Sequence, residues 1–209
     1  VCETIELLDK NATAKEAAEK ITQAIAELYE ENEPKGAAAA CAIIFSKERN
    51  EIWSVGDCQC LINGKLFSHE KEIDRINLDV RTLVLEMAKR EGKTQEELLK
   101  NDLGRGFIMP ILENQHILAN KTGRFSYGIF NGTQIPDEHI VIHKVKEGDE
   151  VVLASDGYPY LKGTLEESER LLKEELINNP LCDGEYRSTK GKAEDNISFD
   201  DRTYIRFKV

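Results

Sequence analysis

The chain has 209 residues, of which 40% are hydrophobic, and this predicts a globular protein with a substantial core. Asp and Glu number 39 against 28 Lys and Arg, so the net charge is −11. This balance argues against a protein that binds nucleic acid through a basic surface, and no apolar run reaches the length of a membrane span.

The first 70 residues alternate between helical and extended patterns. Apolar residues at helical spacing predict a helix from Asn11 or Thr13 to about Glu31, after a short helical stretch within Val1–Lys10. Four short strands follow as two predicted hairpins, Ala37–Phe45 with Glu51–Val55 and Cys60–Ile62 with Lys65–Phe67. Asn63-Gly64 between the last two strands is the strongest hairpin signal in the sequence.

Residues 70–120 are predicted to be mainly helical. One amphipathic face is expected to be buried, formed by Ile76, Val80, Leu83, Val84, Met87 and Ala88. Thr94 and Glu97 form a capping box that begins a second, short helix. Gly104–Gly106 is expected to break the chain before a third helical stretch, Phe107–Leu118.

Beyond residue 120 the strand pattern returns. Strands are predicted at Arg124–Phe130, His139–Val145, Glu150–Ala154 and Thr203–Val209, with one helix at Leu165–Ile177 and a loop over residues 178–196. Hairpins imply antiparallel sheets, and long amphipathic helices must cover a sheet face. The sequence therefore predicts an α+β fold, most simply two sheets with helices outside, in a single domain over residues 1–209.

The cysteines and histidines do not form a recognisable catalytic or metal-binding motif. We interpret the five cysteines as reduced thiols of a cytosolic protein, with a zinc site at Cys58 and Cys60 as the alternative. The four histidines are widely spaced, and we interpret each of them as structural or surface: His69, His116, His139 and His143.

Three predicted strands begin or end in aspartate. Asp156 follows the buried run Val151–Ala154, Asp57 follows the strand that ends at Val55, and Asp200 precedes the last strand. Each aspartate alone is typical of a turn or a cap. Neighbouring strands would bring the carboxylates together, where they repel unless a cation lies between them. Such oxygen ligands suit Mg²⁺ or Mn²⁺.

These stretches resemble, in order, motifs of the metal-dependent protein phosphatases of the protein phosphatase 2C type. Four segments carry the resemblance: IWSVGDCQC, like the family's strand ending in Gly-Asp-Ser; SHEKEIDRI at Ser68–Ile76; VVLASDGYPYL, like its strand plus Ser-Asp-Gly; and DDRTYIRFKV, like its closing Asp-Asn or Asp-Asp strand. The ordered set spans most of the chain from Ala37 onward. The resemblance implies an antiparallel β-sandwich flanked by helices, in α-β-β-α layers.

The resemblance also implies a set of metal ligands. Asp156 and Asp200 would bind Mn²⁺ or Mg²⁺ directly, and Asp57 would serve a neighbouring, more weakly held ion through water. Gly157 would support the turn that carries Asp156, because glycine permits φ > 0 or a close approach of another group. Asp201 would lie beside the ligands rather than among them.

Two ions in such a site would activate a water molecule to hydrolyse phosphoserine or phosphothreonine in a phosphoprotein substrate. No covalent enzyme intermediate is needed, and no catalytic residue beyond the metal ligands is identified. Asp195, in Asp195-Asn196-Ile197, is the competing choice to Asp200, which we prefer because an alternating strand follows it. No nucleic-acid or membrane partner is expected.

The sequence departs from the family pattern in two places. The family's first Asp/Gly motif is expected before the first helix, and this sequence does not contain it. We therefore interpret the chain as part of a phosphatase that lacks its leading strands, with a site for one metal. Tyr160 stands where the family often has an Asp, which disfavours a third ion at Asp57. The alternatives are an inactive phosphatase-like module that binds a protein partner, and an unrelated α+β protein with acidic turns.

Overall fold

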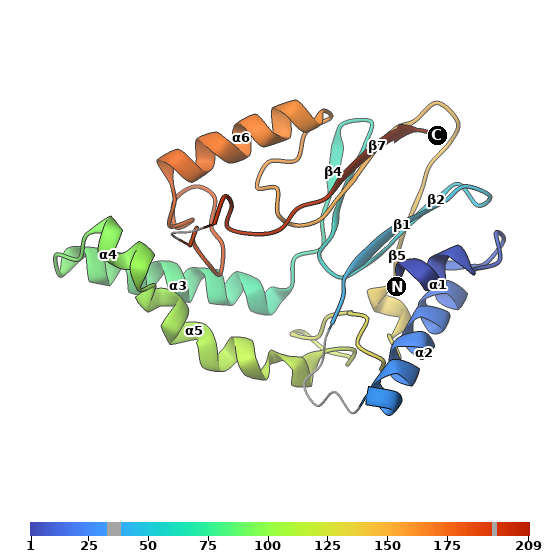
Figure 1. Ribbon diagram of the computed structural model, residues 1–209, viewed down its shortest axis with the longest axis horizontal. Coiled ribbons are helices and arrows are strands. Elements are labelled where there is room, and N and C mark those ends of the chain that lie inside the picture. Colours follow the sequence, from blue (N-terminus) through green and yellow to red (C-terminus); the bar gives the residue numbers. More distant parts are fainter. Residues whose placement is uncertain (33–38, 194–195) are drawn as a thin grey trace.

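Two antiparallel sheets form the centre of the molecule (Figure 1). The computed structural model describes residues 1–32, 39–193 and 196–209. The first sheet has the order β1-β2-β5, with β1 at Ala42–Ser46, β2 at Glu51–Val55 and β5 at Val141–Lys144. The second has the order β4-β3-β6-β7, with β3 at Gln59–Ile62, β4 at Lys65–Phe67, β6 at Glu150–Ala154 and β7 at Tyr204–Lys208.

The two sheets pack face to face through alternate residues of their strands. Ile52 of β2 lies in one cluster with Cys60 of β3 and with Val151 and Leu153 of β6, all buried. The rings of Phe45 and Phe207 meet across the sheets with their centroids 4.6 Å apart. Because side chains alternate along a strand, the intervening residues face outward and need a second layer to cover them.

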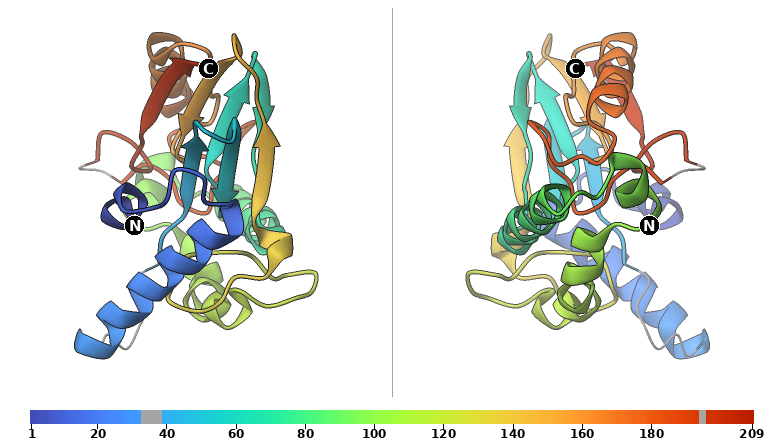
Figure 2. Two further views of the ribbon diagram at one scale, coloured as in Figure 1. Left: turned by 90° about the vertical axis from the view of Figure 1, so that its right-hand side faces the viewer. Right: turned by 90° about the vertical axis from the view of Figure 1, so that its left-hand side faces the viewer.

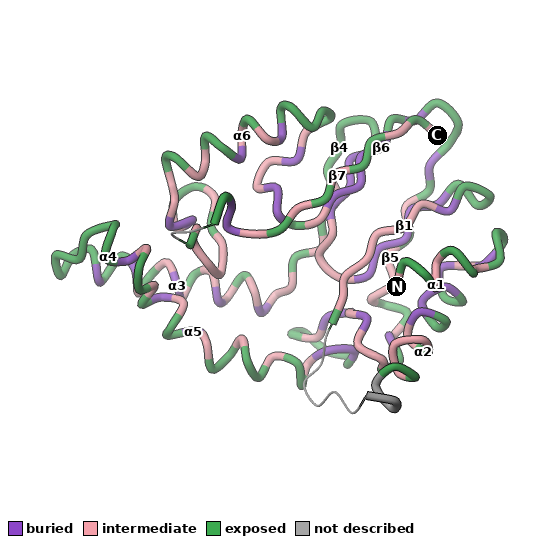
Figure 3. The backbone as a smooth tube through the Cα atoms, in the orientation of Figure 1, coloured by how far each residue is buried: buried purple, intermediate pink, exposed green. Residues whose placement is uncertain are grey.

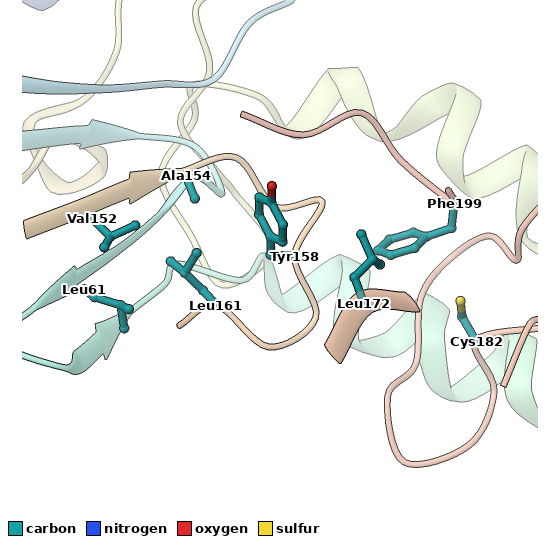
Figure 4. Packing of buried hydrophobic residues seen from close by; sticks show 8 residues of the cluster. All are labelled: Leu61, Val152, Ala154, Tyr158, Leu161, Leu172, Cys182 and Phe199. Atoms are coloured by element: carbon teal, nitrogen blue, oxygen red, sulfur yellow. The ribbon is translucent and has the colours of Figure 1, made fainter. Parts of the chain in front are cut away.

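Helices supply those outer layers. On the first sheet, α2 (Ala14–Asn32) packs Ala14 and Ala17 against Trp53. On the second, α6 (Leu165–Asn178) packs Leu172 into a cluster with Leu61 (Figure 4). In Figure 2, α2 lies in front of the strands in one view and α6 in the other. The predicted α-β-β-α sandwich is therefore confirmed.

The remaining helices are α1 (Cys2–Glu6), α3 (Glu72–Arg90), α4 (Gln95–Lys100) and α5 (Leu103–Asn114), with short 3₁₀ turns at Gln115–Leu118 and Asp137–His139. The Thr94–Glu97 capping box is present at the start of α4, as predicted. Helices α3 and α5 pack on each other and extend away from the sheets (Figure 1). Among the described residues, none of the helices is long and apolar enough to cross a membrane.

The prediction for the buried face of α3 was confirmed for Ala88 and wrong for Leu83 and Met87, while Ile76, Val80 and Val84 are half-buried. Leu83 and Met87 are 57% and 55% exposed, and the α3 residues that are buried are Ile73, Asn77, Arg81, Leu85 and Ala88. Among the strands, burial is concentrated in β2, β3 and β6, and α2 and α3 each bury one side (Figure 3). Helix α3 is turned in this way because the fully buried Arg81 side chain bonds Asp102 and several main-chain carbonyls.

Two further predictions fail for identifiable reasons. The chain does not break at Gly104–Gly106, because Asp102 caps α5 by accepting a 2.7 Å hydrogen bond from the Arg105 amide. Gly104 instead permits close packing, since an added Cβ would lie 2.6 Å from the carbonyl oxygen of Arg81.

The strand predicted at Arg124–Phe130 is absent from this described segment, where only isolated bridges occur. The Asn120 side chain bonds both the N–H and the C=O of Ile129 at 2.9 Å, so a side chain takes the place of a neighbouring strand. The strand predicted from His139 begins at Val141. The first two residues of the strand predicted at Ala37–Phe45 lie outside the described residues.

Candidate functional site

The strand register brings three aspartates to one end of the second sheet. The last residue of β6 pairs with the first residue of β3 and with the first residue of β7. Asp156 comes just after β6, and Asp57 and Asp200 come shortly before β3 and β7. Because these strands are neighbours and antiparallel, the three carboxylates are placed at the same edge.

The carboxyl group of Asp156 responds to both of the others. Asp156 is exposed as a residue, yet partial loss of hydration raises the pKa of its carboxyl group, and the negative charges of Asp57 and then Asp200 raise it further, to about 6. The ordinary value is 3.8. The three side chains therefore form one electrostatic cluster, which we call the carboxylate cluster.

The turn that carries Asp156 is held from two sides. The amide of Gln59 donates to the carbonyls of Ser155 and Tyr158 at 3.2 and 3.0 Å. An added Cβ on Gly157 would clash with the carbonyl oxygen of Asp201, so the glycine permits the close approach of the segment before β7. This packing fixes the position of Asp156 relative to that segment.

Lys71 neutralises one member of the carboxylate cluster. Its ammonium nitrogen lies 2.7 Å from Asp57 and 3.6 Å from Asp74, and 5.0 Å from the centroid of the Tyr127 ring. Burial alone would lower the pKa of Lys71, but Asp57 and Asp74 raise it above its ordinary value. Burial would likewise raise the pKa of Asp57, and Lys71 outweighs this and lowers it. Both groups are charged at neutral pH.

A cavity of about 210 Å³ opens at Asp57 and Asp156. Its walls come from the segment after β4, from the start of α3, from the turn after β6 and from the loop after α6, and include Ser68, Arg75, Pro159, Tyr186 and Arg187. Acidic groups and two arginines thus face the same space, which suits a ligand that carries negative charge beside a bound cation.

Asp200 and Asp201 line a different, neighbouring cavity of about 760 Å³. The Asp200 carboxylate lies 2.9 Å from the ammonium group of Lys190, and the side chains of this pair are 30% and 36% exposed. Asp195, the competing choice, lies outside the described residues. Tyr160 is directed to α6, where its hydroxyl donates to Glu175 at 3.2 Å.

The carboxylate cluster has the donor chemistry for a hard divalent cation. Carboxylate oxygens are the ligands that Mg²⁺ and Mn²⁺ prefer, and a bound cation would offset the negative charges of Asp57 and Asp200 that, after burial, raise the pKa of Asp156. Within residues 1–32, 39–193 and 196–209, no group of three or more His, Cys, Asp or Glu side chains is arranged to hold a metal ion. Of the three carboxylates, that of Asp57 already contacts an ammonium group.

The histidines lie in other surroundings. His69 and His143 stack on each other, with ring centroids 5.8 Å apart. His116 Nδ1 and His139 Nε2 are 2.9 and 2.8 Å from main-chain carbonyl oxygens. All five cysteines are unpaired thiols.

Comparison of the structure with solved structures finds similarity to serine/threonine phosphatases. The chain is similar to the phosphatase PstP/Ppp of Mycobacterium tuberculosis, with 18% identity, a TM-score of 0.33, and 72% of this chain and 56% of that chain covered. It is also similar to the catalytic domain of PstP in complex with two manganese ions, with 16% identity, a TM-score of 0.41 and coverage of 89% and 74%.

A third similar structure is the PPM Ser-Thr phosphatase MsPP of Mycobacterium smegmatis in complex with cacodylate, with 13% identity, a TM-score of 0.30 and coverage of 68% and 53%. The matched region spans little more than half of the first and third of these chains, 56% and 53%. No family model and no curated protein sequence matches the chain. The TM-scores of these three structures are all below 0.5.

Sequence reasoning missed the cations of the site. Lys71 lies within the segment Ser68–Ile76, which carries part of the family resemblance, but no pattern marks it as the partner of Asp57. Lys190 lies in a loop without periodicity. Nothing in the sequence around Gln59 indicates that its side chain holds the turn that carries Asp156. The contacts of these residues join segments that only the three-dimensional structure brings together.

Proposed function

We propose that residues 1–209 form one phosphatase-like domain that hydrolyses phosphoserine and phosphothreonine in phosphoproteins with the help of Mn²⁺ or Mg²⁺. The observation that supports this most strongly is the convergence of Asp57, Asp156 and Asp200 at the ends of three adjacent strands. The ordered sequence motifs that contain these residues point in the same direction.

In this proposal each residue has a separate task. Asp156 and Asp200 hold the cation, Asp201 supports Asp200 from the adjoining main chain, and Gly157 keeps the two segments close. When bound, the cation lowers the pKa of a water molecule and offsets charge on the phosphate oxygens. Water attacks phosphorus and gives up a proton to solvent, the bond to the serine or threonine oxygen breaks, and that oxygen leaves with a proton from solvent.

The cavity at Asp57 and Asp156 receives the phosphorylated side chain. Arg75 and Arg187 at its walls carry positive charge that attracts a phosphate group, although each also contacts a carboxylate of α3. We also propose a cytoplasmic location, which the five unpaired cysteines support because thiols stay reduced there.

Hydrolysis of an aryl phosphate in the presence of Mn²⁺ tests the proposal. The intact chain should show a Mn²⁺-dependent rate, and Asp156→Asn should lower it by about a hundredfold or more, because a metal ligand is lost. Asp137→Asn is the matched control, since Asp137 is an exposed aspartate paired with Lys15. A Mn²⁺-independent rate, or equal rates for the two variants, would contradict the proposal.

A second candidate is an inactive phosphatase-like module that binds a protein partner. The observation that favours it is that Lys71 and Lys190 already contact Asp57 and Asp200 at 2.7 and 2.9 Å. A fluorescent phosphoserine peptide separates the two candidates. Binding in fluorescence anisotropy, without release of phosphate at saturating Mn²⁺, supports the module, whereas turnover supports the enzyme.

A further inference from the structure

Lys71 is held far more firmly than a surface lysine. Its side chain is 14% exposed, whereas the side chain of Lys93, beyond the other end of α3, is 50% exposed. Asp57 and Asp74 contact the ammonium group, and the ring of Tyr127 lies beside it. Buried cations persist in proteins when partners on several sides compensate them, as happens here.

The backbone of Lys71 is fixed as well. Lys71 is the N-cap residue of α3, and its carbonyl accepts hydrogen bonds from the amides of Asp74 and Arg75 at 3.0 and 3.2 Å. A helix N-terminus carries partial positive charge and disfavours a cation there. A lysine at this position therefore does not stabilise α3. Its contact with Asp57 compensates the unfavourable interaction with the helix N-terminus.

We propose that Lys71 is a built-in counter-ion that excludes a metal ion from Asp57, so that the carboxylate cluster accepts one divalent cation rather than two. The ammonium nitrogen, 2.7 Å from the Asp57 carboxylate, stands where a metal or its water would have to approach. A divalent cation beside a fixed ammonium group is repelled strongly because few water molecules screen the two charges. The location of the one accepted ion, at Asp156 and Asp200, rests on the proposed function; exclusion at Asp57 does not.

Lys190 does not exclude a cation in the same manner. The Lys190–Asp200 pair is about a third exposed on both sides, so water and salt screen it and the lysine can swing away when a cation binds. Lys71 has no such freedom, because its side chain lies between Asp57, Asp74 and Tyr127. We therefore expect Lys71 to exclude a cation from Asp57 and Lys190 to admit one at Asp200.

Calorimetric titration of the full chain with MnCl₂ tests the exclusion. Lys71→Met removes the charge and keeps much of the side-chain volume, and should either add one Mn²⁺ per chain or tighten binding at least roughly tenfold, about 1.4 kcal/mol. Lys93→Met is the control of equal net charge, separated from Lys71 by the 19-residue helix α3, which is roughly 28 Å long. It should bind Mn²⁺ as the intact chain does.

Two more variants make the result specific. Lys71→Met combined with Asp57→Asn should lose the added binding, and Lys71→Arg should keep the behaviour of the intact chain. If Lys71→Met is unfolded without metal, Mn²⁺ should restore a cooperative thermal transition, and failure to do so counts against the proposal.

Equal Mn²⁺ stoichiometry and affinity in Lys71→Met and Lys93→Met would overturn the exclusion at Asp57. A gain that survives Asp57→Asn would overturn it too. An intact chain that binds no Mn²⁺ contradicts the proposed function instead, and the exclusion still stands in that case if Lys71→Met gains a site that depends on Asp57.

Discussion

Arg81 and Asp102 form a two-point ion pair between α3 and the start of α5. The Nε and Nη2 atoms of Arg81 lie 3.0 and 2.6 Å from one carboxylate oxygen, and the arginine side chain is completely buried. The same guanidinium donates to the main-chain carbonyls of Leu181, Cys182 and Ser188. It thereby fixes the loop that forms one wall of the cavity at Asp57 and Asp156.

Replacement of Arg81 by Met should destabilise the protein by about 3–5 kcal/mol, because Asp102 loses its cationic partner and three carbonyls lose the hydrogen bonds from the guanidinium. Arg90→Met removes an exposed pair with Glu86 from the same helix and should cost less than about 1 kcal/mol. Urea unfolding followed by circular dichroism measures both values. Similar midpoints for the two variants would show that the buried pair does not anchor the fold.

Gly157→Ala should destabilise the junction between β6 and β7 by about 1–3 kcal/mol, because the new Cβ clashes with the Asp201 carbonyl. Gly163→Ala is the matched control, since nothing lies within 4 Å of a Cβ built at Gly163. Thermal melting reads the difference. Equal melting temperatures for the two variants would show that the turn at Gly157 accommodates a Cβ without a clash.

His69 and His143 should make stability depend on pH. Both Nε2 atoms are buried without a hydrogen-bond partner, and burial lowers the pKa of each ring, with His69 lowering that of His143 further. The unfolded chain therefore takes up protons first as the pH falls below about 6.5. Stability that is fully present above that value should be lost on acidification toward the folded pKa values.

Thermal melting at pH 7.5 and pH 5.5 measures this loss, and His143→Phe should reduce it. The intact chain and His143→Phe are compared at each pH, because the titration of Asp156 changes stability in the same pH range and in the opposite direction. Its raised pKa gives stability that is present at low pH and is lost as the pH rises through about 6. An unchanged loss in His143→Phe would rule out the histidine pair as its source.

Local patterns in the sequence predicted the parts of the site that lie at strand ends. A continuous apolar run identified β6 and alternating residues identified β7, so Asp156 and Asp200 could be recognised before their strands were known to be neighbours. The face of α3 could not be predicted, because the burial of Arg81 depends on Asp102 and on the distant loop 181–188. The role of Lys71 could not be predicted for the same reason, since only the fold brings its side chain to Asp57.

Titration of the intact chain with Mn²⁺, beside Asp156→Asn, tests most directly whether the carboxylate cluster holds a divalent cation. We expect one Mn²⁺ per intact chain and an affinity at least roughly tenfold weaker in the variant, about 1.4 kcal/mol, because Asp156 supplies a charged ligand. Binding of equal strength in the variant, or no binding by the intact chain, would contradict the account.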